Sequence, residues 1–168
     1  MQRAGRFLWL GWAQGEVIGH EMQEDGSIKR VIAEHDGYRH LGVQHRRSLQ
    51  STRNGWVVID SLMPCCKARN KVHQFQVTWM LPDWKYQLKA ENCLLLESPD
   101  ITFKLIIEGA CEINLFRAGE CIHGEMKNQT TWGWIASSYG TRQPALMVVA
   151  TQSGMLPSIF HSIFLFNA

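Results

Sequence analysis

The sequence has few prolines, few charges of either sign and no long apolar run. Among its 168 residues there are 5 Pro, and charged residues make up 19% against 45% apolar residues. This composition excludes a disordered or low-complexity chain and is typical of one globular domain. At this size, folding buries roughly 68–70% of the surface that the unfolded chain exposes. A two-layer core therefore needs no disulfide or metal to hold it together.

Membrane and export signals are weak. The longest apolar stretch near the N-terminus, Phe7 to Ala13, has seven residues, well short of the ~20 that cross a bilayer. Arg3 and Arg6 precede it, as in a signal peptide, but the stretch is too short and has no small-residue cleavage site. We therefore expect no transmembrane segment, and nothing in the sequence predicts export.

Cysteine spacing and charge exclude two further classes. The 5 Cys form no CxxC zinc signature, and Cys65 and Cys66 are adjacent, so a disulfide framework is not expected. Lys and Arg number 17 against 15 Asp and Glu, and they are scattered apart from Arg46-Arg47. Without a dense basic patch to neutralise phosphates, nucleic acid is not an expected partner.

Helical periodicity is missing too, and the apolar pattern has a period close to two. Twelve segments have strand length and are separated by turn residues: 17–22, 28–34, 43–50, 56–62, 72–80, 84–89, 93–97, 102–107, 111–116, 131–135, 145–150 and 159–166. Their spacing predicts an all-β fold, a large antiparallel β-sandwich of about twelve short strands. We take residues 1–13 as an N-terminal segment and residues 14–168 as a single domain.

The strongest hairpin signal is Asn54-Gly55, which lies between the segments 43–50 and 56–62. An antiparallel pair around this turn brings His45 and Asp60 to the same far end. The sequence therefore predicts an imidazole close to a carboxylate.

The stretch from Ala33 to Arg47 is the most chemically equipped part of the chain, with 3 His, 3 Arg and a tyrosine. Tyr38 lies beside Arg39 and between His35 and His40, and positive neighbours lower the pKa of a phenol. Tyr38 and His45 are therefore candidates for proton transfer to or from a sugar. The alternative is structural: Tyr38 anchors a turn opened by Asp36-Gly37.

His45, Asp60 and His73 could converge at adjacent strand ends and bind a cation such as Zn²⁺. No HxH or HExxH motif places two ligands on one face. An Asp that ends an apolar run also serves as a turn cap or as the partner of an arginine. Zinc thus remains one of several interpretations of these three residues.

Aromatic residues offer a glycan-binding surface. In a strand over 131–135, Trp132 and Trp134 would share one face, about 7 Å apart. Tyr139 and Arg142 follow in a short polar loop, and a guanidinium suits a carboxylated sugar. The alternative is that these aromatic rings fill the core.

Several motifs, taken in order along the chain, resemble the C-terminal domain of heparinase II/III-like proteins. They are Glu34-His35-Asp36-Gly37-Tyr38, His45-Arg46-Arg47, Trp56-Val57-Val58-Ile59-Asp60-Ser61-Leu62, His73 with Leu81-Pro82, Gly133-Trp134-Ile135-Ala136-Ser137-Ser138-Tyr139-Gly140, Pro144-Ala145 and Leu156-Pro157. The resemblance covers roughly residues 7–166.

The resemblance implies a bacterial polysaccharide lyase that performs β-elimination at uronic acids and is typically found in the periplasm or cell envelope. In the family, a helical toroid supplies a Tyr base and an Asn/His group, and an HxH segment and metal ligands precede the motif that matches Glu34 to Tyr38. The segment before His35 holds no HxH, Asp-Pro-Gly or His-Asn. No catalytic or metal role is therefore transferred to Tyr38, His45, Asp60 or His73.

The sequence thus predicts the distal β-sandwich of a lyase, inactive without a separate toroid domain or chain, with an acidic polysaccharide as the partner. A carbohydrate-binding module that uses Trp132, Trp134, Tyr139 and Arg142 is the alternative, and a small metal-dependent hydrolase is a third. The apolar stretch around Phe7 to Trp12 is expected to be a surface that packs on a missing part.

Overall fold

The computed structural model describes residues 2–3, 9–65 and 71–166, which form sixteen strands and one short 3-10 helix. Four strands have only two residues: β1 (Gln2–Arg3), β2 (Trp9–Leu10), β13 (Trp134–Ile135) and β14 (Gln143–Pro144). Twelve longer strands remain, and every described pairing is antiparallel. The predicted all-β antiparallel sandwich of about twelve short strands is confirmed.

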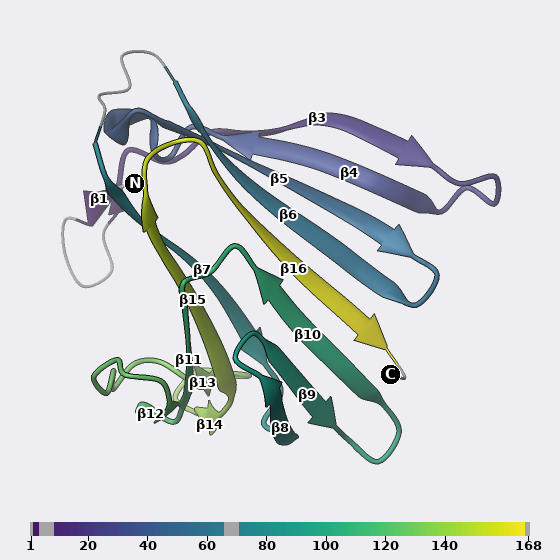
Figure 1. Cartoon of the computed structure of the whole chain (residues 1–168), viewed down its shortest axis with the longest axis vertical. Helices are drawn as coiled ribbons and strands as arrows, with labels where there is room; N and C mark the ends of the chain where they lie inside the picture. The colour runs from purple at the N-terminus through teal and green to yellow at the C-terminus, as the bar shows by residue number, and fades with distance from the viewer. Residues whose placement is uncertain (1, 4–8, 66–70, 167–168) are drawn as a thin grey trace. The chain divides into compact units, whose positions relative to one another are not determined.

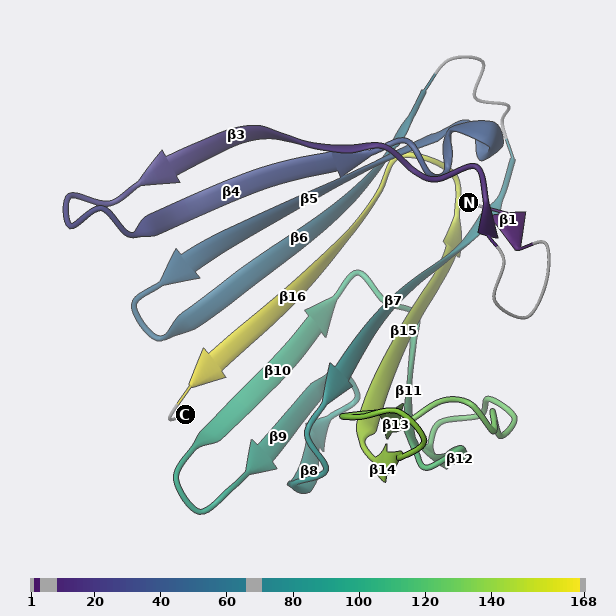
Figure 2. The same ribbon diagram turned by 180° about the vertical axis from the view of Figure 1, so that it is seen from behind.

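The chain divides into two compact units. The first comprises residues 1–73 and 154–164. Its strands β3 (Gly15–Met22), β4 (Ile28–His35), β5 (Val43–Thr52) and β6 (Gly55–Pro64) each pair with the next, and β16 (Ser158–Phe166) lies beside β6. Strands β3–β4 and β5–β6 form the two long hairpins in Figures 1 and 2, and β16 runs alongside β6.

The second unit comprises residues 74–153 and 165–168. One of its layers contains β8 (Lys85–Ala90), β9 (Cys93–Glu97) and β10 (Thr102–Glu108) in neighbouring positions. The other has the order β12-β11-β15-β7, formed by Glu120–His123, Glu112–Arg117, Leu146–Gly154 and His73–Leu81. Leu94 and Leu105 of the first layer face Leu115 and Val148 of the second across a small internal cavity.

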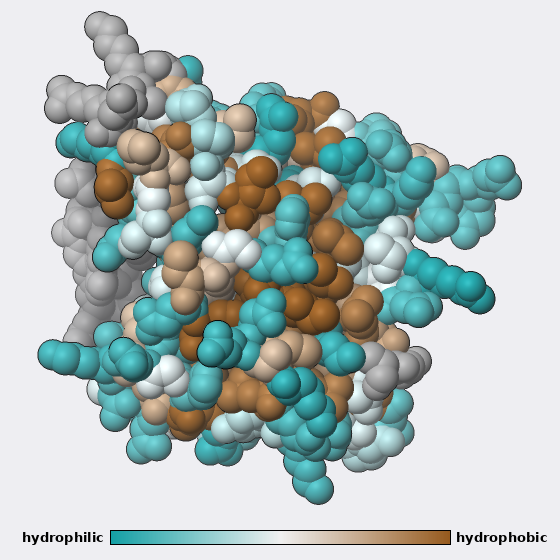
Figure 3. All heavy atoms as spheres, in the orientation of Figure 1, coloured by the Kyte–Doolittle hydropathy of each residue, from teal (hydrophilic) through white to brown (hydrophobic). Residues whose placement is uncertain are grey.

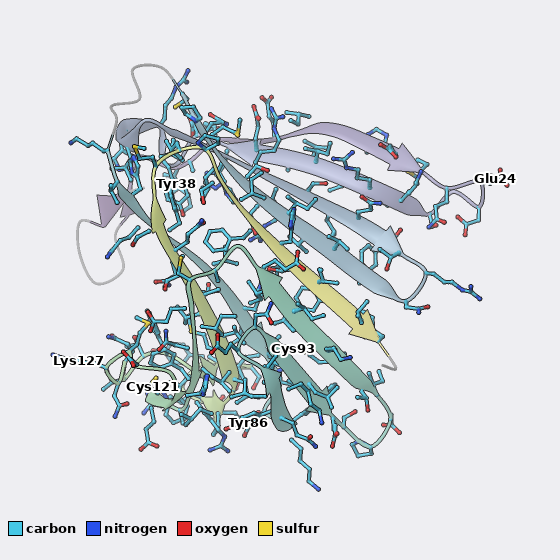
Figure 4. The ribbon with its side chains drawn as sticks, in the orientation of Figure 1. Glu24, Tyr38, Tyr86, Cys93, Cys121 and Lys127 are labelled. Atoms are coloured by element: carbon cyan, nitrogen blue, oxygen red, sulfur yellow. The ribbon has the colours of Figure 1, made fainter. Side chains whose placement is uncertain are left out.

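Alternation along the strands explains this core. In β10, Phe103, Leu105 and Ile107 are buried, and the residues between them are only partly covered. Polar residues gather at the turns, as at the hydrophilic tip of the β3–β4 hairpin that carries Glu24 (Figures 3 and 4). The period of two that predicted the strands is therefore the period with which they bury apolar side chains.

The hairpin between β5 and β6 forms as predicted, with a loop one residue earlier than expected. Thr52 pairs with Gly55, so the two loop residues are Arg53 and Asn54. This register places Arg47 directly opposite Asp60 and His45 opposite Leu62.

The expected strand over 131–135 is wrong. Only Trp134–Ile135 is extended, because Gly133 has a φ of 68° and its carbonyl accepts hydrogen bonds from the amides of Ala118 and Ala145. A Cβ at Gly133 would lie 2.8 Å from Cα of Arg117, so this tight turn requires glycine. Trp132 and Trp134 therefore do not share the face of one strand. Strand β12 was not predicted.

Cys93, Cys111 and Cys121 are free thiols, whereas Cys66 lies outside the described residues. So do Phe7 and Leu8 of the predicted apolar N-terminal surface, whereas Trp9–Leu10 forms β2 and Trp12 is exposed. Among the described residues, no helix is long and apolar enough to span a membrane.

Phe116 tests the packing of the second unit. Its side chain is fully buried in β11 and meets the ring of Trp132 edge-on, with the ring centroids 4.9 Å apart. We expect Phe116→Ala to lower the free energy of unfolding by about 3–5 kcal/mol, since it leaves a cavity. Tyr139→Ala, at a fully exposed ring, should change it by less than about 0.5 kcal/mol. Urea unfolding followed by tryptophan fluorescence measures both, and equal effects would contradict this packing.

Candidate functional site

Two strand registers bring four polar side chains together on one face of the first unit. His35 on β4 pairs with His45 on β5, and Arg47 on β5 pairs with Asp60 on β6. His45 and Arg47 are two residues apart, so their side chains point to the same side of the sheet. The result is a row that runs from His35 through His45 to Asp60 and Arg47.

Asp60 is the anchor of this row. It is buried, and its carboxylate accepts hydrogen bonds from His45 Nε2 at 2.7 Å and from Arg47 Nε at 2.7 Å and Nη2 at 2.9 Å. Burial works to raise the pKa of Asp60, but the hydrogen bonds from His45 and Arg47 and the positive charge of Arg47 outweigh it and lower that pKa. Asp60 is therefore an anion held by two donors. One is His45, the imidazole predicted to lie close to this carboxylate, and the other is Arg47, an arginine partner of the kind named as the alternative to a metal.

The other imidazole nitrogen of His45 meets His35. Nδ1 of His45 lies 2.8 Å from Nε2 of His35, and the amide of Gly37 donates to Nδ1 of His35 at 3.1 Å. A backbone amide only donates, so Nδ1 of His35 is an acceptor and its proton is on Nε2. His35 then donates to Nδ1 of His45, and His45 donates from Nε2 to Asp60. Both neutral rings are Nε2–H tautomers.

This direction of the hydrogen bonds restricts what the two rings do. Each of the four imidazole nitrogens is committed to a partner, so neither ring presents a lone pair to a substrate. Burial first, and then the nearby His45 and Arg47, lower the pKa of His35. Both effects favour the neutral ring that the hydrogen bonds require.

Tyr38 lies where β4 ends and β5 begins, just before the 3-10 helix Arg39–Leu41 (Figure 4). Its ring centroid is 5.2 Å from that of His35 and 6.2 Å from that of His45, and the side chain is exposed. An open pocket of about 480 Å³ lies beside it, lined in part by His35, His45 and Arg47. The carbonyl of Tyr38 accepts the amides of Leu41 and Val43, so the residue also anchors its turn.

The predicted metal ligands are brought together only in part. His45 and Asp60 are in contact, but the second imidazole at His45 is His35. Within the described residues, no group of three or more His, Cys, Asp or Glu side chains is placed to hold a metal ion. Since His45 has no uncommitted nitrogen, these residues do not fit a zinc ion.

The predicted glycan-binding residues lie in the second unit. The ring of Trp132 is half-buried against Phe116. The guanidinium carbon of Arg142 lies 4.0 Å above the ring of Trp134, whose Nε1 donates to the carbonyl of Thr130. Tyr139 is fully exposed. One face of Trp134 is thus covered by Arg142, and Tyr139 and Arg142 form the accessible part of this group.

Fold and site together define an all-β sandwich domain with a buried ionic network along one sheet. Over residues 1–159 the sequence matches the family described as heparinase II/III-like, C-terminal, and the chain belongs to that family. No curated protein sequence matches the chain.

Two solved structures share the fold. One is a heparinase III with methylated lysines, at a TM-score of 0.66 and 13% identity over 91% of this chain. The other is a heparinase III, at a TM-score of 0.61 and 12% identity over 90% of this chain. In both cases the chain spans 21% of the length of the heparinase.

Reasoning from the sequence found His45 and Asp60 together but missed His35 as the second imidazole. The register of β4 against β5 depends on the connection from Asp36 to Gly42, which contains a 3-10 helix rather than a two-residue turn. The sequence did contain a sign that the His35 side chain bonds to its own turn, because Gly37 follows His35 by two residues. This spacing allows an amide to bond a preceding side chain.

Asp60→Asn tests the anchor. The substitution replaces a charged acceptor of His45 and Arg47 by a neutral one, and we expect it to lower the free energy of unfolding by about 1–3 kcal/mol. In the unmodified chain, the contribution of Asp60 is complete above the ordinary carboxyl pKa of about 3.9 and is lost as the pH falls through its lower folded value. That loss should be missing in the variant.

The matched control is Glu21→Gln, which removes an exposed carboxylate 3.6 Å from Lys29. Exposed pairs of this kind contribute about 0–1 kcal/mol. Urea unfolding between pH 2.5 and pH 7 measures both variants. A cost for Asp60→Asn no larger than that of the control would contradict the assignment of Asp60 as the anchor.

Proposed function

We propose that this chain is the distal β-sandwich domain of a polysaccharide lyase that acts on uronic-acid polysaccharides by β-elimination. The observation that carries the proposal is the family match over residues 1–159. The fold shared with two heparinases III over about nine-tenths of the chain supports it.

We further propose that catalysis requires a helical toroid domain. In β-elimination a base removes the proton α to the carboxylate while the glycosidic oxygen leaves, so the base needs an uncommitted lone pair. His45 and His35 use all their nitrogens in the row that ends at Asp60. Their commitment favours a scaffold role for this row and a base that comes from outside it.

Tyr38 keeps its place as a candidate on this unit. Its exposed ring borders the open pocket beside His35 and His45. In the proposed enzyme, Tyr38 contacts the acidic polysaccharide at the edge of the sandwich, and the toroid domain supplies the group that removes the proton.

A lyase assay tests the proposal. The purified chain, alone and mixed with the toroid domain of a heparinase III, is incubated with heparin, heparan sulfate or alginate. Elimination creates an unsaturated uronate that absorbs at about 235 nm. We expect no increase in absorbance with the chain alone and an increase with a fused or added toroid.

Two outcomes would contradict the proposal. Elimination by the chain alone would overturn the need for a toroid. If the fusion also fails with every uronate polymer, while the same toroid fused to its own sandwich is active, the assignment as a lyase domain is wrong. If the fusion is active, Tyr38→Phe in it separates a role for the hydroxyl of Tyr38 from a role for its ring.

A carbohydrate-binding module for acidic glycans is the second candidate. The full exposure of Tyr139 and the position of Arg142 over Trp134 favour it. The loop that carries them is closed by a 2.7 Å contact between the hydroxyls of Ser138 and Thr141. A ring and a guanidinium held in this way suit a sugar that bears a carboxylate.

For this candidate, Tyr139→Ala and Arg142→Ala should each weaken binding to immobilised heparin by about 1–3 kcal/mol, as expected for interface anchors. The matched control is Trp12→Ala, which removes an aromatic ring that is 76% exposed in the other unit. Affinity electrophoresis measures all three. Unchanged retention of the two variants, or an equal loss in the control, would remove the binding surface.

A further inference from the structure

We propose that His35, His45 and the amide of Gly37 form a proton-sensitive latch that holds the turn Asp36–Gly42 closed when both rings are neutral and releases it in acid. The latch is defined by the 3.1 Å bond from Gly37 N to His35 Nδ1 and the 2.8 Å contact between His35 Nε2 and His45 Nδ1. It goes beyond the proposed lyase function and does not depend on it.

The latch has two fixed ends. At one end the Gly37 amide only donates, and at the other the Asp60 carboxylate, held by Arg47, only accepts. Between them, two neutral rings fit in one direction alone, with each proton on Nε2. Every position along the row is filled, so an additional proton finds no vacant acceptor that leaves the bonds intact.

Consider a proton added to His35. The only nitrogen of this ring without a hydrogen is Nδ1, and the new N–H there points at the N–H of Gly37. Two donors then face each other at hydrogen-bond distance, and the bond to the turn is lost.

A proton added to His45 has the same result. It enters at Nδ1 of His45, which faces the Nε2–H of His35. For this contact to remain a hydrogen bond, His35 must release its Nε2 proton and carry one on Nδ1 instead. One proton is taken up in total, and Nδ1 of His35 again bears a hydrogen that opposes Gly37. Whichever ring holds the charge, the link to the turn breaks.

The packing at Gly37 makes the latch sensitive to this change. A Cβ placed on Gly37 would lie 3.0 Å from His35 Nδ1 and 3.1 Å from Cβ of Ala13. The backbone therefore lies close against the ring, with no room for a water molecule between them. A lost hydrogen bond can be replaced only if the turn moves away.

The charged and titratable groups around the two rings come from every adjoining element: Glu16 on β3, Glu34 on β4, Asp36, Tyr38 and Arg39 in the turn, Arg47 on β5 and Asp60 on β6. Glu34 is paired with Arg46 at 3.0 Å, and Asp36 accepts the amide of Gln14 at 2.8 Å. Burial first, and then the electrostatic effect of His45 and Arg47, lower the pKa of His35 and outweigh Asp36.

The sign of the pH effect follows. A histidine whose pKa is lower in the closed turn than in the open turn binds its proton more weakly when the turn is closed. Closure is therefore complete above the ordinary histidine pKa of about 6.5 and is lost as the pH falls below it. The released turn carries Tyr38 and Arg39, so the open pocket beside Tyr38 changes shape in the same range.

NMR on the full, ¹⁵N-labelled chain tests the latch. At pH 7.5 both rings should show a bare Nδ1 and a protonated Nε2. Between pH 7 and pH 5, Nδ1 of His35 should become protonated, and the protection of the Gly37 amide against hydrogen exchange, corrected for intrinsic rates, should fall by about tenfold or more. A protonated Nδ1 on His35 at pH 7.5, or unchanged protection while His35 titrates, would overturn the proposal.

Two variants sharpen the result. His35→Asn keeps an acceptor two residues before Gly37 but does not titrate, so protection of Gly37 should no longer depend on pH. His40→Gln removes an exposed histidine from the same turn, and the pH dependence should stay as in the unmodified chain. A pH dependence that survives in His35→Asn, or disappears in His40→Gln, assigns the switch to another group. If His35→Asn does not fold, the measurements on the unmodified chain decide alone.

Discussion

The buried carboxylate of Asp60 is the constraint on which the first unit depends. A charge removed from water is stable only where donors surround it. Two donors come from the neighbouring strand, Arg47 directly across from Asp60 and His45 two pairs further along on the same face. A shift of one residue between β5 and β6 would turn both donors to the other face and leave the anion unpaired. Asp60 therefore fixes the register of the hairpin more strictly than apolar packing alone would.

The hydrogen bonds of Asp60 on β6 also determine those of the turn that follows β4. Because Asp60 only accepts, His45 must donate to it. His45 then accepts from His35, and His35 accepts from Gly37. The ionisation of one carboxylate thus sets the tautomers of two rings and the position of a backbone amide in the turn that follows β4, two strands away in the sheet. A row that is fully committed in this way is well suited to hold a surface in place and poorly suited to abstract a proton.

Much of this fold could be predicted from the sequence, because alternate residues of these antiparallel strands are apolar and buried. The segments around β9 and β10 were placed almost to the residue. The strand over 131–135 failed for a local reason: Gly133 occupies a left-handed conformation that the aromatic pattern around it does not reveal. His35 was missed for a different reason. Its partner is set by a connection that contains a 3-10 helix, and no turn motif gives that register. His45 and Asp60, joined by a short hairpin, were found.

The two units bury different kinds of polar group: the first buries a carboxylate, and the second buries an amide. In the second unit, the buried Asn114 accepts the amide of Met126 at 2.9 Å and donates to Glu112 at 2.8 Å. Its amide does not titrate, and the loop that it holds passes so close at Gly124 that a Cβ there would overlap it. Of the buried polar residues in the described part of the chain, Asp60 alone is ionisable; the others are Ser48, Asn114, Ser158 and Ser162. The one ionisable side chain among these buried residues therefore lies in the first unit, in the row that ends beside Tyr38.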